Sequence, residues 1–423
     1  MKNIIENLWD ALDHARGVME VPHVIELFAF VALIAKEAPD KFHLLANTGQ
    51  ANQISSLKEA GFSLRDKFPE EVCSPPDEYK VDLRILNIAI SVLNEINEFS
   101  ELASALREFM TSTGKFSGEM SSNESLEHVF KALVGDCSGK SLYDGASGLA
   151  WITSSLNAEM LYLEEVNYTT WVTAFRLLAL EDKHFELTNS NSLLKPRFKN
   201  VKADLVVTEP PMSLKFDADI RRELAQASFI IVPTKGPVPA SAGDALWIQH
   251  ALSHLNEEGK AYIMIPQGFL FRGGYDAKVR EYLLEHELLE AVIGLPQSIL
   301  NFTSLSPVIL VLNKNKPPAS PVHFIDASEI CIKTGNMVLI SEEDARLIAD
   351  LATGKLGDDP RFKAAYISEI RAYENNLSIS RYITKELEIK KLNLAEELKE
   401  LERRQDEFTK AQQSLTSLLN KFK

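Results

Sequence analysis

The sequence predicts an α/β protein built on a doubly wound, mostly parallel sheet, with an all-α domain before the sheet and a helical tail after it. Three observations support this prediction. From Ser125 onward, short apolar runs alternate with stretches of helical periodicity, the order that builds a parallel sheet covered by helices. Residues 1 to about 135 show helical character throughout. The tail, residues 384–423, repeats apolar residues every seven positions.

The first region, residues 1–120, is predicted to be a helical recognition or assembly domain. Pro22 suits the first turn of a helix that runs to Ala35. This segment is apolar except for Glu26, but it is too short to span a bilayer, so a buried helix is expected. Apolar residues at helical spacing predict a second helix over Val81–Phe99.

Residues 121–330 are predicted to form the sheet domain, and residues 331–383 a connecting region. The expected strands are Lys140–Asp144, Met160–Glu165, His184–Thr188, Ala203–Thr208, Lys260–Ile265, Leu288–Ile293 and Val308–Leu312. The expected helices between them include Tyr168–Leu180, Asp244–Glu257 and Asp276–Glu287. Gly259 is expected to cap the second of these helices.

Two acidic residues, Asp144 and Glu165, end the first two predicted strands. A carboxylate at the end of the second strand of such a sheet is placed to accept hydrogen bonds from a ribose diol. Gly145 and Gly148 follow Asp144 and would let a nucleoside approach the backbone. Because this loop matches neither GxGxxG nor a P-loop, a plain turn between strand and helix is equally compatible with it.

The apolar run Ala203–Thr208 leads directly into Glu209, Pro210, Pro211 and Met212. Proline has no N–H to donate to a sheet, so the strand must stop there. The result is a stiff loop at the carboxyl end of a strand, where open α/β sheets bind ligands. Taken alone, this run favours a simple strand followed by a rigid turn.

The formal net charge of −15 excludes a global basic field that would attract nucleic acid. One local basic cluster exists, formed by Lys195, Arg197, Lys199 and Lys202. The cluster suits a solvated loop better than a phosphate-binding patch, and both interpretations stay open.

Neither a disulfide nor a metal site is predicted. The three cysteines are scattered and form no CxxC pair. His250 and His254 have a spacing that can bind zinc, but no third ligand is near them. The N-terminal segment carries Glu6 and Asp10 where a signal peptide would need an apolar core, so a cytoplasmic protein without membrane contact is expected.

The tail has the seven-residue period of a coiled-coil seam. The repeated apolar residues are Leu387, Leu394, Leu401, Phe408, Leu415 and Phe422. The companion positions four residues later are mostly polar, which favours a coiled coil that needs a partner over a self-contained zipper. One long amphipathic helix folded against the body fits the same pattern.

Gly243–Lys316 contains the blocks IPQGFLFRGG, VREYLLE, AVIGLPQ and VILVLNKNK in that order. This stretch resembles the modification (methyltransferase) subunits of type I restriction–modification systems, the adenine-specific DNA methylases. LWDALDHARG near the N-terminus and NLSISRYI (Asn376–Ile383) resemble other parts of the same family. The resemblance implies a Rossmann-like methyltransferase sheet, S-adenosylmethionine as cofactor and DNA as substrate. It also implies a DNA-specificity-type subunit as partner, bound through the C-terminal helix.

In that family the target adenine is flipped out of the duplex. The motif after the fourth strand is Asn-Pro-Pro followed by Phe or Tyr. The Asn side chain and the first proline carbonyl accept the two N–H bonds of the adenine amine, and the aromatic ring stacks on the base. By this resemblance, the catalytic positions are Glu209, Pro210, Pro211 and Met212. The cofactor positions are Asp144, Gly148, Glu165 and Asn191.

Several of these positions depart from the family pattern. Glu209 replaces Asn, Met212 replaces the aromatic residue, and Asn191 replaces the Asp that contacts the cofactor's adenine. Leu149 and Ala150 add side chains where the family has Ser-Gly. The Thr-Pro that precedes the family's cofactor domain has no counterpart in residues 121–124.

These departures favour a methylase-like subunit that has lost methyl transfer and serves assembly or DNA handling in a restriction or anti-phage complex. A methylase with a variant motif is the alternative. A dehydrogenase on a dinucleotide-binding fold is a poor fit, because the chain lacks the glycine fingerprint and nothing in Gly243–Lys316 supports it.

Overall fold

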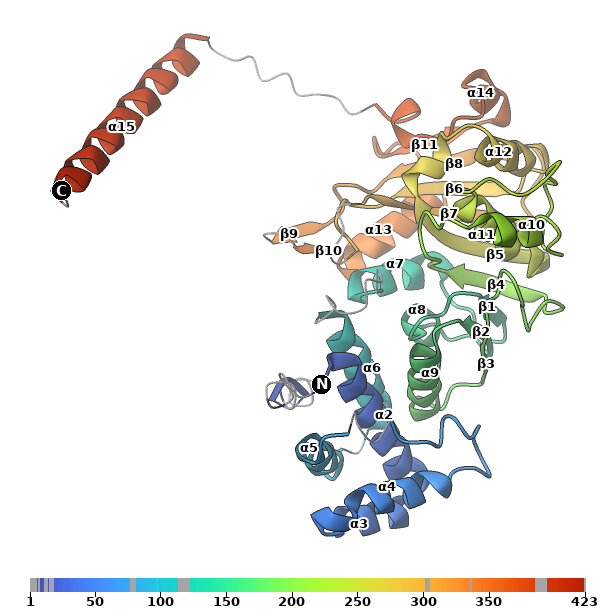
Figure 1. The fold of residues 1–423 in the computed structure, drawn as a ribbon. Coiled ribbons are helices and arrows are strands. Elements are labelled where there is room, and N and C mark those ends of the chain that lie inside the picture. Colours follow the sequence, from blue (N-terminus) through green and yellow to red (C-terminus); the bar gives the residue numbers. More distant parts are fainter. Residues whose placement is uncertain are drawn as a thin grey trace. The chain divides into compact units, whose positions relative to one another are not determined.

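The computed structural model describes residues 19–76, 81–96, 98–112, 122–300, 305–334, 337–384 and 394–421, together with residues 6, 8–10 and 14. The chain divides into two compact units, Met1–Ile383 and Thr384–Lys423. Figure 1 shows the helical N-terminal part in blue and the sheet in green to orange.

The N-terminal part is helical, as predicted. Its elements are α2 (Val21–Glu37), α3 (Pro39–Ala46), the 3-10 helix η1 (Gln50–Asn52), α4 (Gln53–Phe62), α5 (Leu83–Leu93) and α6 (Phe99–Ser112). Helix α2 starts with proline in its first turn and is buried over most of its length. The single helix predicted for Val81–Phe99 is wrong in its extent, since α5 ends at Leu93, the chain turns at Asn94 and Glu95, and α6 begins at Phe99.

The predicted sheet is confirmed as doubly wound and mostly parallel, with strand order β11-β8-β6-β7-β5-β4-β1-β2-β3. The seven predicted strands are β1 (Ser141–Asp144), β2 (Met160–Glu165), β3 (Phe185–Asn189), β4 (Ala203–Thr208), β5 (Leu255–Pro266), β6 (Leu289–Gly294) and β7 (Pro307–Asn313). Strand β7 runs antiparallel to β5 and β6, whereas β1, β2, β3, β4 and β5 are parallel to their neighbours in that part of the sheet. The carboxyl ends of β1 to β5 therefore share one edge.

Helices cover both faces of the sheet (Figure 1). They are α7 (Glu124–Val134), α8 (Trp151–Ser155), α9 (Tyr168–Leu180), α10 (Ala218–Leu224), α11 (Gly243–Ser253), the 3-10 helix η3 (Gln267–Leu270) and α12 (Tyr275–Glu285). Strand β4 shows how the faces are separated, because Leu205 and Val207 pack into one core and Val206 into the other.

Two further strands extend the sheet. Strand β8 (Val322–Asp326), at the end of the predicted sheet domain, pairs with β6, and β11 (Phe362–Ala365), in the region 331–383 that was expected to be a connection, pairs with β8 at the sheet edge. The other elements are the hairpin β9 (Ile332–Thr334) and β10 (Met337–Leu339), α13 (Glu342–Ala352), α14 (Ile367–Ala372) and the 3-10 helix η4 (Ile379–Arg381).

The helix predicted for Asp244–Glu257 is wrong at its C-terminal end. Helix α11 ends at Ser253, and Leu255 already pairs with Ala203 of β4. Gly259 therefore lies inside β5 and caps no helix. The pairing of β4 with β5 shifts register here, and a Cβ on Gly259 would come within 3.1 Å of the Ala203 carbonyl oxygen. Strand pairing has overridden the local helical pattern.

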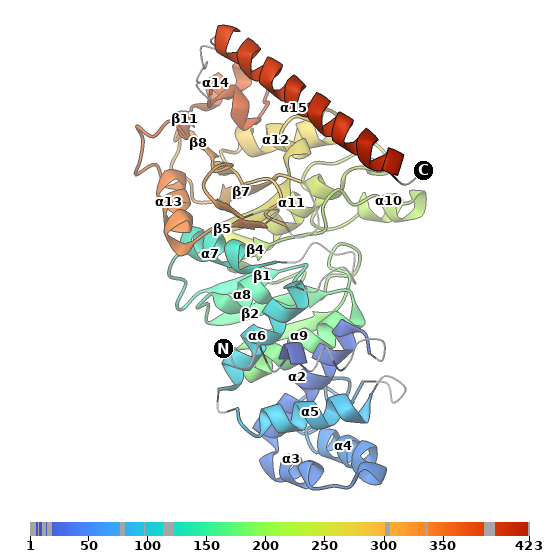
Figure 2. The ribbon, with the colours of Figure 1, turned by 90° about the vertical axis from the view of Figure 1, so that its left-hand side faces the viewer.

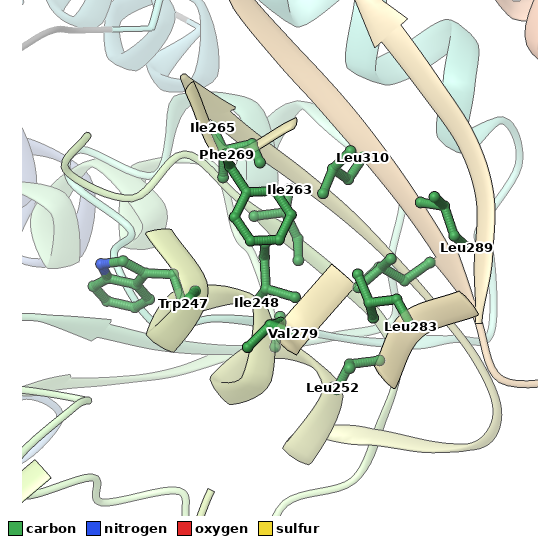
Figure 3. Close-up of a cluster of buried hydrophobic side chains, with 14 of the residues drawn as sticks. Trp247, Ile248, Leu252, Ile263, Ile265, Phe269, Val279, Leu283, Leu289 and Leu310 are labelled. Carbon is green, nitrogen blue, oxygen red and sulfur yellow. The ribbon is translucent and has the colours of Figure 1, made fainter. Parts of the chain in front are cut away.

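The core on one face packs α11 and α12 against the middle of the sheet (Figure 3). Trp247, Ile248 and Leu252 come from α11, and Val279 and Leu283 come from α12. They meet side chains of the neighbouring strands, among them Ile263, Ile265, Leu289 and Leu310. Burial of each such side chain contributes about 1.5–3 kcal/mol, so this layer holds the strand ends in a fixed arrangement.

Two buried arginines connect the N-terminal helices to the sheet domain, with α2 and α6 beside α9 (Figures 1 and 2). Arg176 of α9 donates hydrogen bonds to the carbonyl oxygens of Val72 and Glu26. Arg107 of α6 forms an ion pair with Glu181, and its Nε donates to the carbonyl oxygen of Leu149 at 2.9 Å. The N-terminal helices thereby contact the loop that follows β1.

The second unit contains α15 (Leu394–Lys421). The side chains of Leu398, Leu401 and Phe408 are 51%, 60% and 68% exposed. Leu387 and Phe422 of the predicted repeat lie outside the described residues. Among the helices of the part of the chain that is described, none has the length and apolar character needed to cross a membrane.

Candidate functional site

The residues selected from the sequence meet at the carboxyl edge of the sheet. Asp144 ends β1, Glu165 ends β2, Asn191 follows β3 by two residues, and Glu209 directly follows β4. Strand β1 lies between β2 and β4 and is parallel to both. The parallel pairing therefore places these side chains in a row along one edge.

Glu165 ties the loops after β1 and β2 together. Its carboxylate accepts a hydrogen bond from the Gly148 N–H at 2.9 Å and another from the Asn167 N–H at 2.6 Å. Gly148 has a φ of 53°, a left-handed conformation that favours glycine, and a Cβ there would meet no atom within 4 Å. The backbone at Gly148 is therefore open on the side where a side chain would stand.

Leu149 and Ala150, which replace Ser-Gly of the family pattern, direct their side chains into protein cores. The Leu149 side chain packs against the core of the N-terminal helices. Ala150 is fully buried in the core on the α7 face of the sheet. Both side chains serve packing between elements. The sequence comparison could not reveal their direction, because direction depends on how the N-terminal helices dock on the sheet.

Gly145 is required by packing and does not provide an opening for a ligand. A Cβ on Gly145 would lie 2.8 Å from Cε1 of His250 and 3.0 Å from the Tyr143 hydroxyl. The Tyr143 ring stacks on His254 with centroids 3.9 Å apart. Burial lowers the pKa values of His250 and His254, so both rings are neutral at pH 7. In the described residues, no three His, Cys, Asp or Glu side chains are arranged to hold a metal.

An open cleft of about 660 Å³ lies beyond the ends of β2 and β3. It is lined by Val166, Asn189, Ser190, Asn191, Leu194, Lys195, Pro196 and Arg197. The side-chain oxygen of Asn191 accepts hydrogen bonds from the N–H groups of Leu193 and Leu194 and so shapes the wall of the cleft. The cleft combines apolar and amide surfaces beside Glu165, a lining suited to a nucleoside.

The basic cluster lies on the loop that forms one wall of this cleft. All four members are exposed, and Lys202, at the end of the loop, donates a hydrogen bond to the carbonyl oxygen of Ser253, which leaves Lys195, Arg197 and Lys199 facing the solvent. Buried Glu164 anchors the loop by accepting hydrogen bonds from the N–H groups of Arg197 and Phe198 at 3.1 and 3.4 Å. The cations are therefore carried on a fixed backbone. Whether they bind phosphate stays a prediction.

Glu209 and Asp144 are two acids at adjoining strand ends; Asp144 is buried, and Glu209 is half-buried with its Oε1 atom shielded from solvent. Burial and, to a smaller extent, the nearby Asp144 raise the pKa of Glu209 to about 7, against a hydrogen bond from Ser122 that lowers it. Burial also raises the pKa of Asp144 to about 7, against a hydrogen bond from the Ala146 N–H at 3.0 Å. Near neutral pH, each acid is close to half ionised.

Three polar atoms in this region are buried without a hydrogen-bond partner among the described residues: Ser147 Oγ, Thr208 Oγ1 and Glu209 Oε1. Thr208 is only 3% exposed. An unpartnered buried polar atom costs about 1–3 kcal/mol, so several of them at one strand edge indicate a ligand-binding site.

The loop after Glu209 is fixed by a charged network that the sequence did not reveal. Asp244 accepts a hydrogen bond from the Ser213 N–H at 3.0 Å, and Arg272 forms ion pairs with Asp244 and Asp276. Ser213 adopts a φ of 55°. The Met212 side chain packs partly against the core on the α7 face. A methionine in that position offers apolar contact but no flat ring to a base.

Sequence reasoning also missed Ser122, whose hydroxyl donates to Glu209 Oε2. Ser122 lies just before α7, far from Glu209 along the chain, so spacing could not connect the two residues. The available signal was its position, because residues 121–124 stand where the family has its Thr-Pro.

Comparisons with known proteins agree with this geometry. A family model described as N-6 DNA Methylase matches residues 101–391. The chain is 27% identical over 245 residues to the type I restriction enzyme MpnII methylase subunit of Mycoplasma pneumoniae, covering 55% of this chain and 45% of that protein. It is 26% identical over 320 residues to the HindI methylase subunit of Haemophilus influenzae, covering 70% of each.

A solved type I methyltransferase subunit from Streptococcus thermophilus has the same fold. It superposes with a TM-score of 0.74 at 20% identity, over 90% of this chain and 99% of that one. The chain spans less than half the length of the Mycoplasma relative.

Proposed function

The chain belongs to the N-6 DNA methylase family, and we propose that it is the adenine-methylating modification subunit of a type I restriction–modification complex. In this proposal it binds S-adenosylmethionine at the carboxyl edge of the sheet and works on DNA with a DNA-specificity-type subunit. The observation that carries the proposal is the group of unpartnered buried polar atoms at the carboxyl edge of the sheet, Ser147 Oγ, Thr208 Oγ1 and Glu209 Oε1. A cleft opens at the same edge, beyond the ends of β2 and β3.

The residues present fit an adenosine-containing cationic cofactor. Glu165 ends β2 next to Val166 of the cleft lining, and each of its carboxylate oxygens would accept a further hydrogen bond from a ribose hydroxyl. Val166, Asn189 and Asn191 offer apolar and amide contacts to a base. Gly148 leaves its backbone open, and Asp144 supplies negative charge. When bound, S-adenosylmethionine supplies an electrophilic methyl group on a sulfonium.

The Glu209–Met212 loop is the proposed site for the flipped adenine. Glu209 Oε1 and the carbonyl oxygen of Pro210 would accept the two N–H bonds of the exocyclic amine. This would localise the nitrogen lone pair toward the methyl group, and holding the two reactants in line removes much of the entropic barrier. Asp244 fixes the loop by accepting a hydrogen bond from the Ser213 N–H, and Arg272 fixes Asp244 through an ion pair.

One observation favours a second candidate, a non-catalytic methylase-like subunit that serves assembly or DNA handling. Met212 packs partly into the core and gives no aromatic platform, whereas base stacking on an aromatic ring contributes about 1–3 kcal/mol. Under this alternative the fold and the cofactor site persist, but the adenine is held too weakly for transfer.

Calorimetry with S-adenosylmethionine and a methyl-transfer assay on adenine-containing duplex DNA separate these functions. The proposal predicts micromolar cofactor binding and transfer by the chain in complex with its specificity-type subunit. Binding without transfer, followed by a gain of transfer in Glu209→Asn/Met212→Phe, would establish the non-catalytic alternative. If the folded chain did not bind the cofactor, both candidate functions would be refuted, since each includes a working cofactor site.

A further inference from the structure

Glu209 can carry a negative charge, whereas the neutral amide that the family has at this position cannot. Its Oε2 accepts a hydrogen bond from Ser122, while its Oε1 is buried and without a partner in the described part of the chain. The unpartnered Thr208 hydroxyl stands beside it in sequence and faces Asp144 of β1. This edge of the sheet therefore carries two side-chain oxygens that have no hydrogen-bond partner among the described residues.

The charged groups around the Thr208 and Glu209 side chains are acidic. Asp144 faces Glu209 from β1, and Glu165 faces Asp144 from β2. The pKa of Glu209 is shifted by burial, by the Ser122 hydroxyl and by the Asp144 carboxylate. Among the described residues, no cation contributes to the pKa shift of Glu209 or of Asp144. Two or more carboxylates that share a buried space repel one another, and a bound cation relieves that repulsion.

We propose that Glu209 makes the site selective for charge, so that it binds the positively charged sulfonium form of the cofactor in preference to the uncharged thioether left after methyl transfer. This inference rests on the proposed function, because it assumes that the cofactor occupies this edge of the sheet. It assigns Glu209 a role in releasing the spent product, which an asparagine could not perform by charge.

The selectivity requires an ionised Glu209. Since burial raises the pKa of Glu209 to about 7, the acid is mostly neutral at about pH 6 and mostly ionised at about pH 8. A cation favours the ionised form, so binding S-adenosylmethionine near pH 7 should release protons from the site, whereas S-adenosylhomocysteine should release fewer. If binding needs the ionised acid, the preference for the cationic form rises about tenfold between these two pH values.

The experiment is calorimetry of the full chain with S-adenosylmethionine and with S-adenosylhomocysteine, at about pH 6 and about pH 8. Each titration is repeated in two buffers of different ionisation enthalpy, which counts the protons released. The variant Glu209→Gln keeps the size and polarity of the side chain but removes its charge. Asp144 is kept in both proteins, so the comparison reports the loss of the Glu209 charge together with the change that this loss causes in the ionisation of Asp144.

At about pH 8 the affinity ratio of sulfonium to thioether should fall about tenfold in Glu209→Gln, and at about pH 6 it should agree with wild type within about twofold. Proton release on binding S-adenosylmethionine should also decrease. Glu209→Asp, which keeps the charge, should retain most of the ratio at high pH. Glu285→Gln, an exposed change on α12, should behave as wild type.

An equal ratio in wild type and Glu209→Gln at high pH would overturn the inference, while the binding itself would still support the proposed function. Binding of neither ligand by folded wild-type chain would overturn the proposed function and the inference together. If Glu209→Gln does not fold, Glu209→Asp still tests the inference. This variant keeps the charge, so a lower affinity ratio of sulfonium to thioether in folded Glu209→Asp would also contradict the inference.

Discussion

At the scale of single residues, the acid Glu209 should make the stability of the fold depend on pH. Its folded-state pKa is raised to about 7 from 4.5. The folded state therefore holds a proton that the unfolded state has lost between these values, and stability falls as pH rises from about 4 to about 7. Above that range the ionised acid destabilises the fold by roughly 3 kcal/mol.

We therefore expect Glu209→Gln to unfold at a higher urea concentration than wild type at about pH 8, with a difference of roughly 1–3 kcal/mol in the free energy of unfolding. At about pH 5 the two proteins should be nearly equal, because Glu209 is then protonated. Glu285→Gln serves as the exposed control and should match wild type at both pH values. A constant difference across pH would mean that the charge of Glu209 has no energetic cost in the fold.

Leu149 offers a second test at this scale. Its side chain packs against the N-terminal core, and Arg107 binds its carbonyl oxygen. Restoring the family residue with Leu149→Ser should lower the free energy of unfolding by roughly 1–2 kcal/mol, because apolar contact is lost. Affinity for S-adenosylmethionine, measured by calorimetry, should change by no more than about twofold. A clear gain in affinity would show that Leu149 does obstruct the cofactor.

At the scale of elements, the loop between β3 and β4 joins the cleft to the basic cluster. Because Glu164 anchors this loop, Lys195, Arg197 and Lys199 are held in place beside the site. If they contact DNA phosphates, changing all three to Ala should reduce the slope of log K against log salt concentration by about 2 to 3.

This slope is best measured by fluorescence anisotropy of a duplex bound to the chain together with its specificity-type subunit. The matched control changes Lys41, Lys278 and Lys363 to Ala, three exposed lysines on other elements. Equal slopes for wild type and the loop variant would assign the cluster to a solvated loop.

The same elements show where sequence reasoning succeeds. Strands β1 to β7 were predictable because each is an apolar run bounded by polar or turn residues, and their parallel order fixes which strand ends meet. Asp144, Glu165 and Glu209 were found for that reason. The end of α11 was not predictable, because Leu255 leaves the helix to pair with β4, a contact distant in sequence. The partners Ser122 and Arg272 depended on similar distant contacts.

Strands β8 and β11 were missed for a related reason. Both are short: β8 pairs with β6 and β11, and β11 forms the edge of the sheet. Val322–Asp326 has no regular alternation of apolar and polar residues and is too short to be distinguished from a loop. Strands of this length are stabilised by the sheet that is already present, so local sequence carries little of the signal.

At the scale of the whole molecule, the chain consists of a body that carries the candidate site and a C-terminal helix that carries none of it. Helix α15 exposes Leu398, Leu401 and Phe408. Leu401 and Phe408 are separated by seven residues, the spacing of a coiled-coil seam. Exposed apolar residues at this spacing favour a helix that binds a partner. We propose the DNA-specificity-type subunit as that partner.

Deleting residues 385–423 should leave thermal unfolding of the body unchanged but abolish its complex with a co-expressed specificity-type subunit, as measured by gel filtration. A sharper variant is Leu401→Glu/Phe408→Glu, which keeps the helix length but places two charges on the seam, where burial would be costly. Lys399→Glu makes the same change in net charge at a position five residues from the repeated Leu394, on another face of the helix. This control should still elute with the partner. Co-elution of the truncated chain would exclude the helix as the assembly element and direct the search to the N-terminal helices.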